Sequence, residues 1–203
     1  YTVSNYYNQV FDNPEQWDRT IYVPEFMGFT LLTISANYPH KNLLIIKKVV
    51  QKLKIEYPEF QFRFILTINE SEFLNESDKD IKDNILCIGK IAINQCPALY
   101  DKCNAVFLPT LLECFSATYP EAMRMRKPIL TSNLNFAFEL CGDAAIYFNP
   151  LNVDEIAHKI YQVAYDNDLK VRVVKNGIKQ LMMFNDYTVR AKKYIQIVTN
   201  NIN

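Results

Sequence analysis

Two carboxylates with seven residues between them, Glu113 and Glu121, lie in the stretch TLLECFSATYPEAM. An apolar run typical of a buried strand, AVFLP, precedes the stretch, and Pro120 fits only the first turn of a helix. We therefore expect Glu113 in the loop and Glu121 on the first helical turn. The free amides and the dipole of a helix start attract anions, and carboxylates accept hydrogen bonds from hydroxyls. The pair thus suits a phosphate that carries a sugar or a ribose.

The same spacing also has a purely structural interpretation. Thr118-x-x-Glu121 is a capping-box pattern, in which the glutamate would satisfy only a backbone amide. Either acid taken alone is more often a cap or a solvated side chain than a ligand contact. The spacing by itself leaves both interpretations open.

The elements that must position these acids alternate along the chain. Short apolar runs alternate with longer helical patterns from Gly28 onward, which is typical of βα units on a parallel sheet. We expect an α/β fold with a doubly wound, mostly parallel, Rossmann-like sheet, in which ligands bind beyond the carboxyl ends of the strands. Strands are expected at residues 29–35, 62–68, 85–89, 105–109, 128–132 and 145–148. Helices are expected at residues 41–56, 95–102, 117–126, 136–141, 153–165, 169–184 and 187–198.

Composition excludes several function classes. The 22 Lys and Arg residues balance the 22 Asp and Glu residues, so no net charge draws the chain to nucleic acid. The five cysteines show no CxxC spacing and the two histidines lie far apart, which favours reduced thiols and no zinc site. The four glycines cannot form the GxGxxG pattern of a dinucleotide oxidoreductase.

The residues around the acid pair resemble a known family. Glu113, the run Glu121-Ala122-Met123, the strand PILTS, Glu139 and the later GDAA at 142–145 follow in the same order as in the C-terminal donor-binding domain of retaining GT-B glycosyltransferases of family 4, the glycosyl transferases group 1. The resemblance covers about residues 29–184. It implies that this chain is the C-terminal lobe of a GT-B fold.

The resemblance also implies a role for individual residues. Glu113 would bind hydroxyls of the donor sugar, Glu121 the ribose, and Lys41 would begin the first helix and neutralise the donor diphosphate, so that Glu113 and Lys41 are the expected catalytic residues. A fixed cation and helix amides stabilise the charge of the leaving diphosphate, so we expect no metal and no cofactor. The remaining expected donor-binding residues are Phe115, Ser116 and Ala117 at the helix start, Lys90 and Ile91 beside the base, and His40.

Three positions depart from the family pattern. Ala36 stands where the family usually has an arginine, which removes one phosphate cation; His40 could replace part of that charge if it is protonated. Cys114 and Ser116 replace glycines after the first acid, so the backbone should approach the donor less closely.

These observations lead to two functional hypotheses. The first is a retaining glycosyltransferase of the hexosyl type that transfers a sugar from a nucleotide-sugar to an unknown acceptor, in polysaccharide or glycoconjugate biosynthesis. The second is a non-catalytic nucleotide-sugar-binding module. We expect residues 1–28 to be a linker or edge segment from a missing N-terminal acceptor-binding domain, and residues 29–203 to be the nucleotide-sugar-binding domain with C-terminal helices. The fragment alone should transfer little or no sugar.

The expected location is the cytoplasm. No apolar run approaches the roughly 20 residues of a membrane span. Residues 170–193 carry seven basic residues and one acidic residue, Asp186, which is usual for a solvated face. Contact with anionic lipid at the inner face of the membrane is the alternative.

Overall fold

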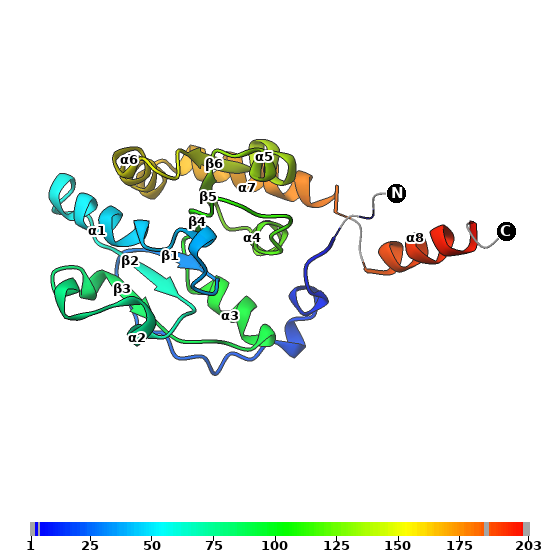
Figure 1. The fold of residues 1–203 in the computed structure, drawn as a ribbon, viewed down its shortest axis with the longest axis horizontal. Coiled ribbons are helices and arrows are strands. Elements are labelled where there is room, and N and C mark those ends of the chain that lie inside the picture. Colours follow the sequence, from blue (N-terminus) through cyan, green and yellow to red (C-terminus); the bar gives the residue numbers. More distant parts are fainter. Residues whose placement is uncertain (1–2, 4, 185–186, 201–203) are drawn as a thin grey trace.

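Six parallel strands form one sheet in the computed structural model, which describes residues 3, 5–184 and 187–200 (Figure 1). The strands are β1 Phe29–Thr33, β2 Phe62–Leu66, β3 Ile85–Cys87, β4 Ala105–Leu108, β5 Ile129–Ser132 and β6 Ala145–Phe148. Their order across the sheet is β3-β2-β1-β4-β5-β6, and each neighbouring pair is parallel. The expected doubly wound, Rossmann-like fold class is therefore confirmed.

The helices follow the expected pattern, and most of their ends are shifted by one to four residues. They are α1 Ile45–Glu56, α2 Glu70–Phe73, α3 Cys96–Asp101, α4 Thr118–Arg124, α5 Asn135–Cys141, α6 Val153–Tyr165, α7 Asn167–Leu181 and α8 Tyr187–Asn200. The one-turn helix α2 was not expected from the sequence. The expectation that Lys41 begins the first helix is wrong, because Lys41 ends a 3-10 turn, Pro39–Lys41, and Asn42 then takes a left-handed conformation with φ of 53°.

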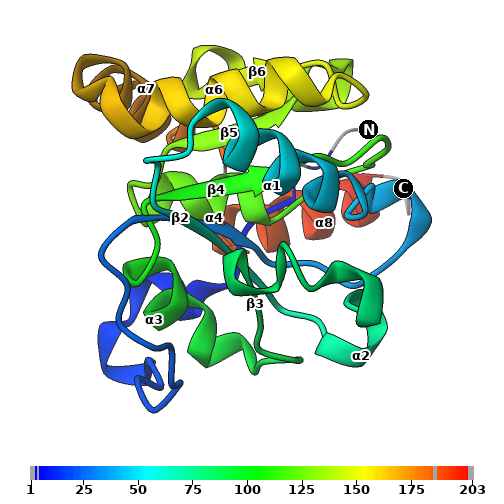
Figure 2. The ribbon, with the colours of Figure 1, turned by 90° about the vertical axis from the view of Figure 1, so that its left-hand side faces the viewer.

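Side chains alternate between the two faces of the sheet and meet different helices. Leu31, Phe64 and Phe107 point into a core that α1 and α6 complete. Their chain neighbours Leu32 and Ile65 point to the other face, where α3, α4 and α5 cover them. Figure 2 looks onto the face that α1 covers. Because helices cover both faces, the exposed edge at the carboxyl ends of the strands is left for a ligand.

The segment before β1 packs on the domain through a few aromatic anchors. Its described part contains two 3-10 turns, Gln9–Asp12 and Pro14–Gln16, and no strand, so it is not an edge strand of the sheet. Phe11 is fully buried and its ring contacts Tyr100 of α3 edge-on. Part of this segment is thereby held next to the helices on the α3 side.

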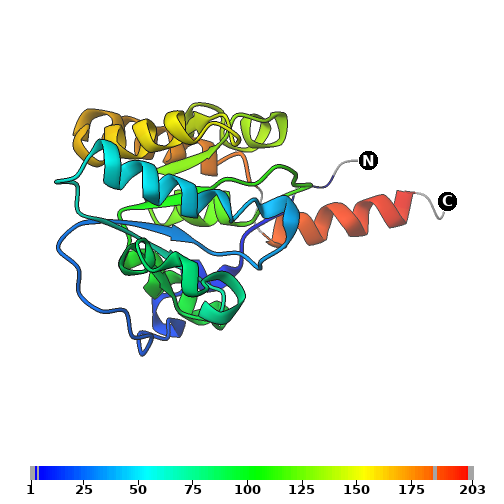
Figure 3. The same ribbon diagram turned by 60° about the vertical axis from the view of Figure 1, so that its left-hand side comes forward.

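The helix α8 extends away from the sheet and its covering helices (Figures 1 and 3). None of its residues is buried, and its side chains include the exposed Tyr194, Ile195 and Val198. Asp186, the acidic residue of the basic 170–193 segment, lies outside the described residues, as do the outermost ends of the two expected domains. Within the described ranges, no helix is long and apolar enough to span a membrane.

Candidate functional site

The direction in which successive strands are added to the sheet reverses between β1 and β4, and the loops that follow these two parallel strands meet there. β1 is continued outward on one side by β2 and β3, whereas β4 is continued on the other side by β5 and β6. In an open α/β sheet such a switch point leaves a crevice beyond the carboxyl ends of the strands. The loop after β1 supplies Lys41, and the loop after β4 supplies Glu113.

Lys41 and Glu113 form an ion pair across this crevice, through Nζ and Oε1. The side chains are 22% and 10% exposed, so the pair is largely removed from solvent. The space left beside it, between Thr33, Ser35 and Ser116, is about 10 Å³, which is hardly room for one water. The two expected catalytic residues thus lie together, and in this state each neutralises the other.

Backbone and amide hydrogen bonds hold the two loops in place. The carbonyl of His40 accepts from the Leu111 amide at 2.7 Å and from Thr110 Oγ1 at 3.1 Å. Asn42 Nδ2 donates to the carbonyls of Pro109 and Pro150, which follow β4 and β6. These contacts fix the position of Lys41, and the sequence analysis missed both Asn42 and Thr110. An asparagine directly after the lysine was the available signal, because asparagine tolerates the left-handed conformation.

The imidazole of His40 lies outside the crevice. It is exposed and stacks on Tyr38, with ring centroids 5.8 Å apart. The backbone of His40, rather than its ring, therefore organises the site. Ala36 is exposed, and its methyl side chain supplies no charge at the position of the missing arginine.

The loop between Glu113 and α4 presents a row of unpaired amides. The backbone N–H groups of residues 113–118 make no hydrogen bond to any described residue. Ser116 is buried against the crevice, Ala117 is the N-cap of α4, and the ring of Phe115 contacts Phe184 after α7 at 6.3 Å. Unpaired amides beside a lysine form an anion-binding arrangement.

Glu121 lies on the first turn of α4, as expected, but it does not cap the helix. No side chain caps α4, so the capping-box interpretation of Thr118 and Glu121 is wrong. The carboxylate instead accepts a hydrogen bond at Oε2 from Tyr100 Oη, at 3.1 Å. Glu121 is 6% exposed, and burial raises the pKa of its carboxyl to about 7, while the bond from Tyr100 lowers it.

Lys90 and Ile91 follow β3, at the same edge of the sheet. Gly89, with φ of 74°, turns the chain there, Lys90 is exposed and Ile91 is half-buried. Neighbouring strands lie about 4.8 Å apart, so the end of β3 is roughly 10 Å from that of β1. This separation is comparable to the distance from a diphosphate to a nucleobase. The roles of these residues stay predictions.

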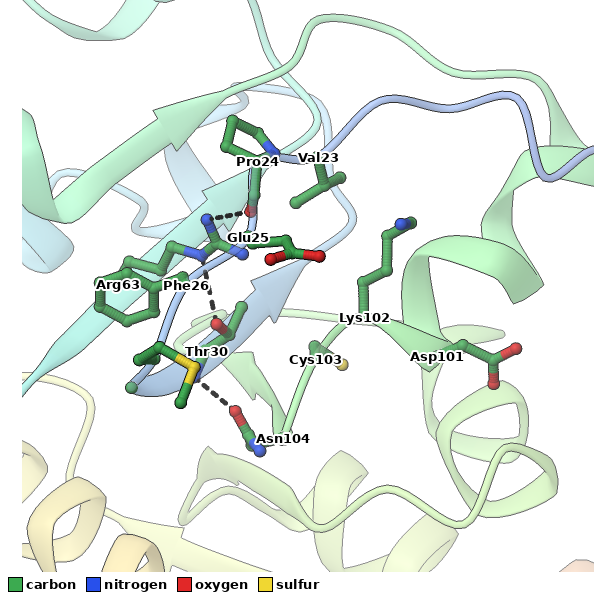
Figure 4. Close-up of a pocket in the computed structure, with 12 residues that line it drawn as sticks. Val23, Pro24, Glu25, Phe26, Thr30, Arg63, Asp101, Lys102, Cys103 and Asn104 are labelled. Carbon is green, nitrogen blue, oxygen red and sulfur yellow. Dashed lines mark hydrogen bonds between the residues drawn. The ribbon is translucent and has the colours of Figure 1, made fainter.

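Larger hollows lie away from this edge. One hollow, of about 480 Å³, lies beside the amino ends of β1 and β2 (Figure 4). Arg63 is buried in its wall, donates from Nε to Thr30 Oγ1 and from Nη1 to the Pro24 carbonyl, and lies over the ring of Phe26. These contacts fasten the segment before β1 to the sheet, which is a structural role. A second hollow of about 600 Å³ lies between α6, α7 and β6.

Metal-ligand clusters are absent from the part of the chain that the structure describes: no three His, Cys, Asp or Glu side chains come together there. The positive groups that face the crevice are Lys41 and the backbone amides. The arrangement can hold an anion and the hydroxyls attached to it.

A known family matches most of the chain. The profile of the family described as Glycosyl transferases group 1 matches residues 24–180. This chain belongs to the group 1 glycosyltransferases. The match includes β1 to β6 and each expected site residue.

Relatives of this group 1 glycosyltransferase are distant in sequence and close in fold. The O-antigen chain mannosyltransferase RfbU of Salmonella typhimurium is 22% identical over 169 residues, which are 73% of this chain and 46% of that protein. A glycosyltransferase from Rickettsia africae superimposes with a TM-score of 0.77 at 16% identity, over 99% of this chain and 57% of that one. The sucrose-phosphate synthase of Thermosynechococcus elongatus superimposes with a TM-score of 0.70 at 13% identity, over 97% of this chain and 49% of that one.

These likenesses confirm that the fold is the C-terminal lobe of a GT-B glycosyltransferase. The chain spans less than half the length of the curated relatives it matches.

Proposed function

We propose that this chain is the donor-binding lobe of a retaining GT-B glycosyltransferase of family 4, which transfers a hexosyl group from a nucleotide-sugar to an acceptor that a second domain would bind. The observation that carries the proposal is the convergence of Lys41 and Glu113 at the β1–β4 switch point, beside the unpaired amides of residues 113–118. A lysine and amides suit the diphosphate, and a carboxylate suits the sugar hydroxyls.

The ion pair suggests how the donor would enter. The diphosphate of the donor takes the ammonium of Lys41 and the loop amides, and Glu113 is released from Lys41 to accept hydrogen bonds from the sugar. Glu121 accepts from the ribose, and the base extends toward Lys90 and Ile91. When the bond from the anomeric carbon to the phosphate oxygen breaks, negative charge grows on the leaving diphosphate. Lys41 and the amides stabilise that charge.

The sugar and the product class are proposed from the relatives. Two curated relatives are named O-antigen chain mannosyltransferases, so a mannosyl donor and a surface polysaccharide or glycoconjugate product are the first to test. We also propose that the complete protein works in the cytoplasm, at the inner face of the membrane where lipid-linked acceptors reside.

Titration of sugar nucleotides into the wild type and into Lys41→Met tests the proposal. Binding without added divalent metal, weakened about ten-fold or more by Lys41→Met, is expected, because a charge-assisted hydrogen bond contributes about 1.5 to 3 kcal/mol. Lys48→Met, which removes an exposed lysine of α1, is the matched control and should bind like the wild type. Equal affinities of Lys41→Met and Lys48→Met for the sugar nucleotide would refute the assignment of Lys41 to the diphosphate. Loss of wild-type binding on addition of a chelator would refute binding without a metal.

A second candidate function is a nucleotide-sugar-binding module without catalysis, which the missing cation at Ala36 favours. The complete protein decides between the two, because a module would bind the donor and release neither the nucleoside diphosphate nor a glycosylated product.

A further inference from the structure

The carboxylate of Glu121 is held by a tyrosine from another helix. Tyr100 lies on α3, is fully buried, and donates its hydroxyl to Glu121 Oε2 at 3.1 Å. Burial raises the pKa of Tyr100 far above its usual value, so this hydroxyl stays protonated and remains the donor at every pH at which the protein would be assayed.

The other oxygen of the same carboxylate remains available. Oε1 of Glu121 makes no hydrogen bond to any described residue. Among the described residues, Ser132 Oγ is the only fully enclosed side-chain polar atom that lacks a hydrogen-bond partner. Oε1 of Glu121 also lacks a partner but is not such an atom, so it is not fully enclosed and keeps contact with solvent. A nearly buried carboxylate with one oxygen bound and one reachable is suited to receive a hydroxyl from a ligand.

Packing fixes the tyrosine that makes this bond. The ring of Phe11, from the segment before β1, meets the Tyr100 ring edge-on, with centroids 5.6 Å apart and planes at 79°. Phe11 is itself fully buried. The position of Tyr100 is therefore set from one side by the segment that leads into the domain.

We infer that Tyr100 is a positioning residue for donor binding: its hydroxyl holds Glu121 Oε2 and thereby directs Oε1 to the ribose hydroxyls of the nucleotide. The inference rests on the proposed function, which places Glu121 at the ribose. It assigns a role to a residue outside the acid pair, and it gives the bond between α3 and α4 a consequence for affinity that packing alone would not have.

The pH dependence of binding separates positioning from packing. The titratable groups of α3 whose ionisation senses Glu121 are Tyr100 and Cys96, and burial raises the pKa of Cys96 to about 12. No ion pair joins Glu121 to a described cation. Below pH 9 these neighbours do not titrate, so the carboxyl of Glu121 itself, with a pKa of about 7, sets the local pH response.

The experiment is calorimetric titration between pH 5.5 and pH 9 with uridine diphosphate and guanosine diphosphate, and with their 2′,3′-dideoxy analogues. The analogues carry the same diphosphate, so they correct for phosphate ionisation near pH 6. The proteins are the wild type, Tyr100→Phe and Tyr119→Phe. Tyr119 is the matched control, because it is a fully buried tyrosine of α4 whose hydroxyl bonds Thr131 and not Glu121.

The wild type should bind a ribonucleotide more tightly as pH rises through about 7. Removal of the Tyr100 hydroxyl takes away a hydrogen bond that favours the ionised carboxylate of Glu121. The midpoint of the pH dependence of the affinity should therefore move to higher pH. At pH 6.5 the affinity of Tyr100→Phe should fall about five- to ten-fold, and at pH 9 the deficit should shrink to about two-fold. The dideoxy analogues should not distinguish this variant from the wild type.

An unchanged midpoint in Tyr100→Phe, or an equal shift in Tyr119→Phe, would overturn the inference while the proposed function stands. Wild-type protein that binds no nucleotide, or that binds ribo and dideoxy forms equally, would refute the placement of Glu121 and the inference with it. If Tyr100→Phe does not fold, Phe11→Leu loosens the same ring and should move the midpoint in the same direction by less; an unchanged midpoint there counts against the inference.

Discussion

Replacement of Glu113 by glutamine should separate the two partners of the central ion pair. In the present state Lys41 is bound to Glu113, so a diphosphate must break that pair before it can use the lysine. Glutamine keeps the size of the side chain and removes its charge. We expect Glu113→Gln to bind a bare nucleoside diphosphate more tightly than the wild type, and to lose its preference for the sugar nucleotide.

The magnitudes follow from exposure and charge. The side chains of the pair are 22% and 10% exposed, and a pair of this kind contributes about 1 kcal/mol, so its removal should strengthen diphosphate binding about five-fold. A charge-assisted hydrogen bond to the sugar contributes about 1.5 to 3 kcal/mol. The ratio of sugar-nucleotide affinity to diphosphate affinity should therefore fall by roughly ten- to 150-fold.

Calorimetry with a nucleoside diphosphate and its sugar nucleotide, on both proteins, measures the two effects. Asp78→Asn is the control, because Asp78 and Lys47 form an ion pair of similar burial, 11% and 17% exposed, and neither residue lines the crevice. The control should bind both ligands like the wild type. Weaker diphosphate binding by Glu113→Gln, or an unchanged ratio of the two affinities, would refute the assignment of Lys41 to the diphosphate and of Glu113 to the sugar.

Three further predictions concern Glu121 and the loops. Glu121→Gln should weaken binding of the nucleoside diphosphate about ten-fold or more, because the ribose loses a charged acceptor; an unchanged dissociation constant would remove Glu121 from the ribose site. The folded pKa of Glu121, about 7, lies above its ordinary value of 4.5, so its ionisation destabilises the fold as pH rises between these values. Chemical denaturation should therefore find Glu121→Gln more stable than the wild type at pH 8, by up to about 3 kcal/mol, and no more stable at pH 4.5. The same difference in the free energy of unfolding at both pH values would contradict the raised pKa of Glu121. Asn42→Ala should lower the free energy of unfolding by about 2 to 3 kcal/mol, because two hydrogen bonds are lost and alanine is strained at a positive φ. Asn42→Gly should lose only the hydrogen bonds, because glycine adopts this φ without strain. Equal free energies of unfolding for the two variants would show that φ contributes nothing.

The succession of strands and helices along the chain was predictable because its signals are local. Each strand is a short apolar run, and α6 was predicted with the bounds that it has, Val153–Tyr165, since Ile156, Ile160 and Val163 recur at helical spacing and are buried. Pro120 likewise fixed the start of α4 to within a residue. The short helix α2 was missed, because four residues give no periodicity.

The errors arose where contacts distant in sequence override local pattern. Lys41 precedes α1 instead of starting it, because Asn42 turns the chain to reach the carbonyls of Pro109 and Pro150. The capping-box pattern at Thr118 is present in the sequence, yet Glu121 is bound by Tyr100, which lies 21 positions earlier. A local pattern cannot show which of two competing partners a side chain will find.

The sequence by itself determined the α/β alternation, the family and the residue types available for donor binding, since these depend on near neighbours and on motif spacing. Only the tertiary structure decided that Lys41 and Glu113, 72 positions apart, neutralise each other, and that Glu121 is nearly buried beneath a tyrosine. The physical reason is that strand order sets which loops meet, and burial sets the pKa of a carboxylate. Both depend on how the whole sheet is assembled, and no short stretch of residues contains that information.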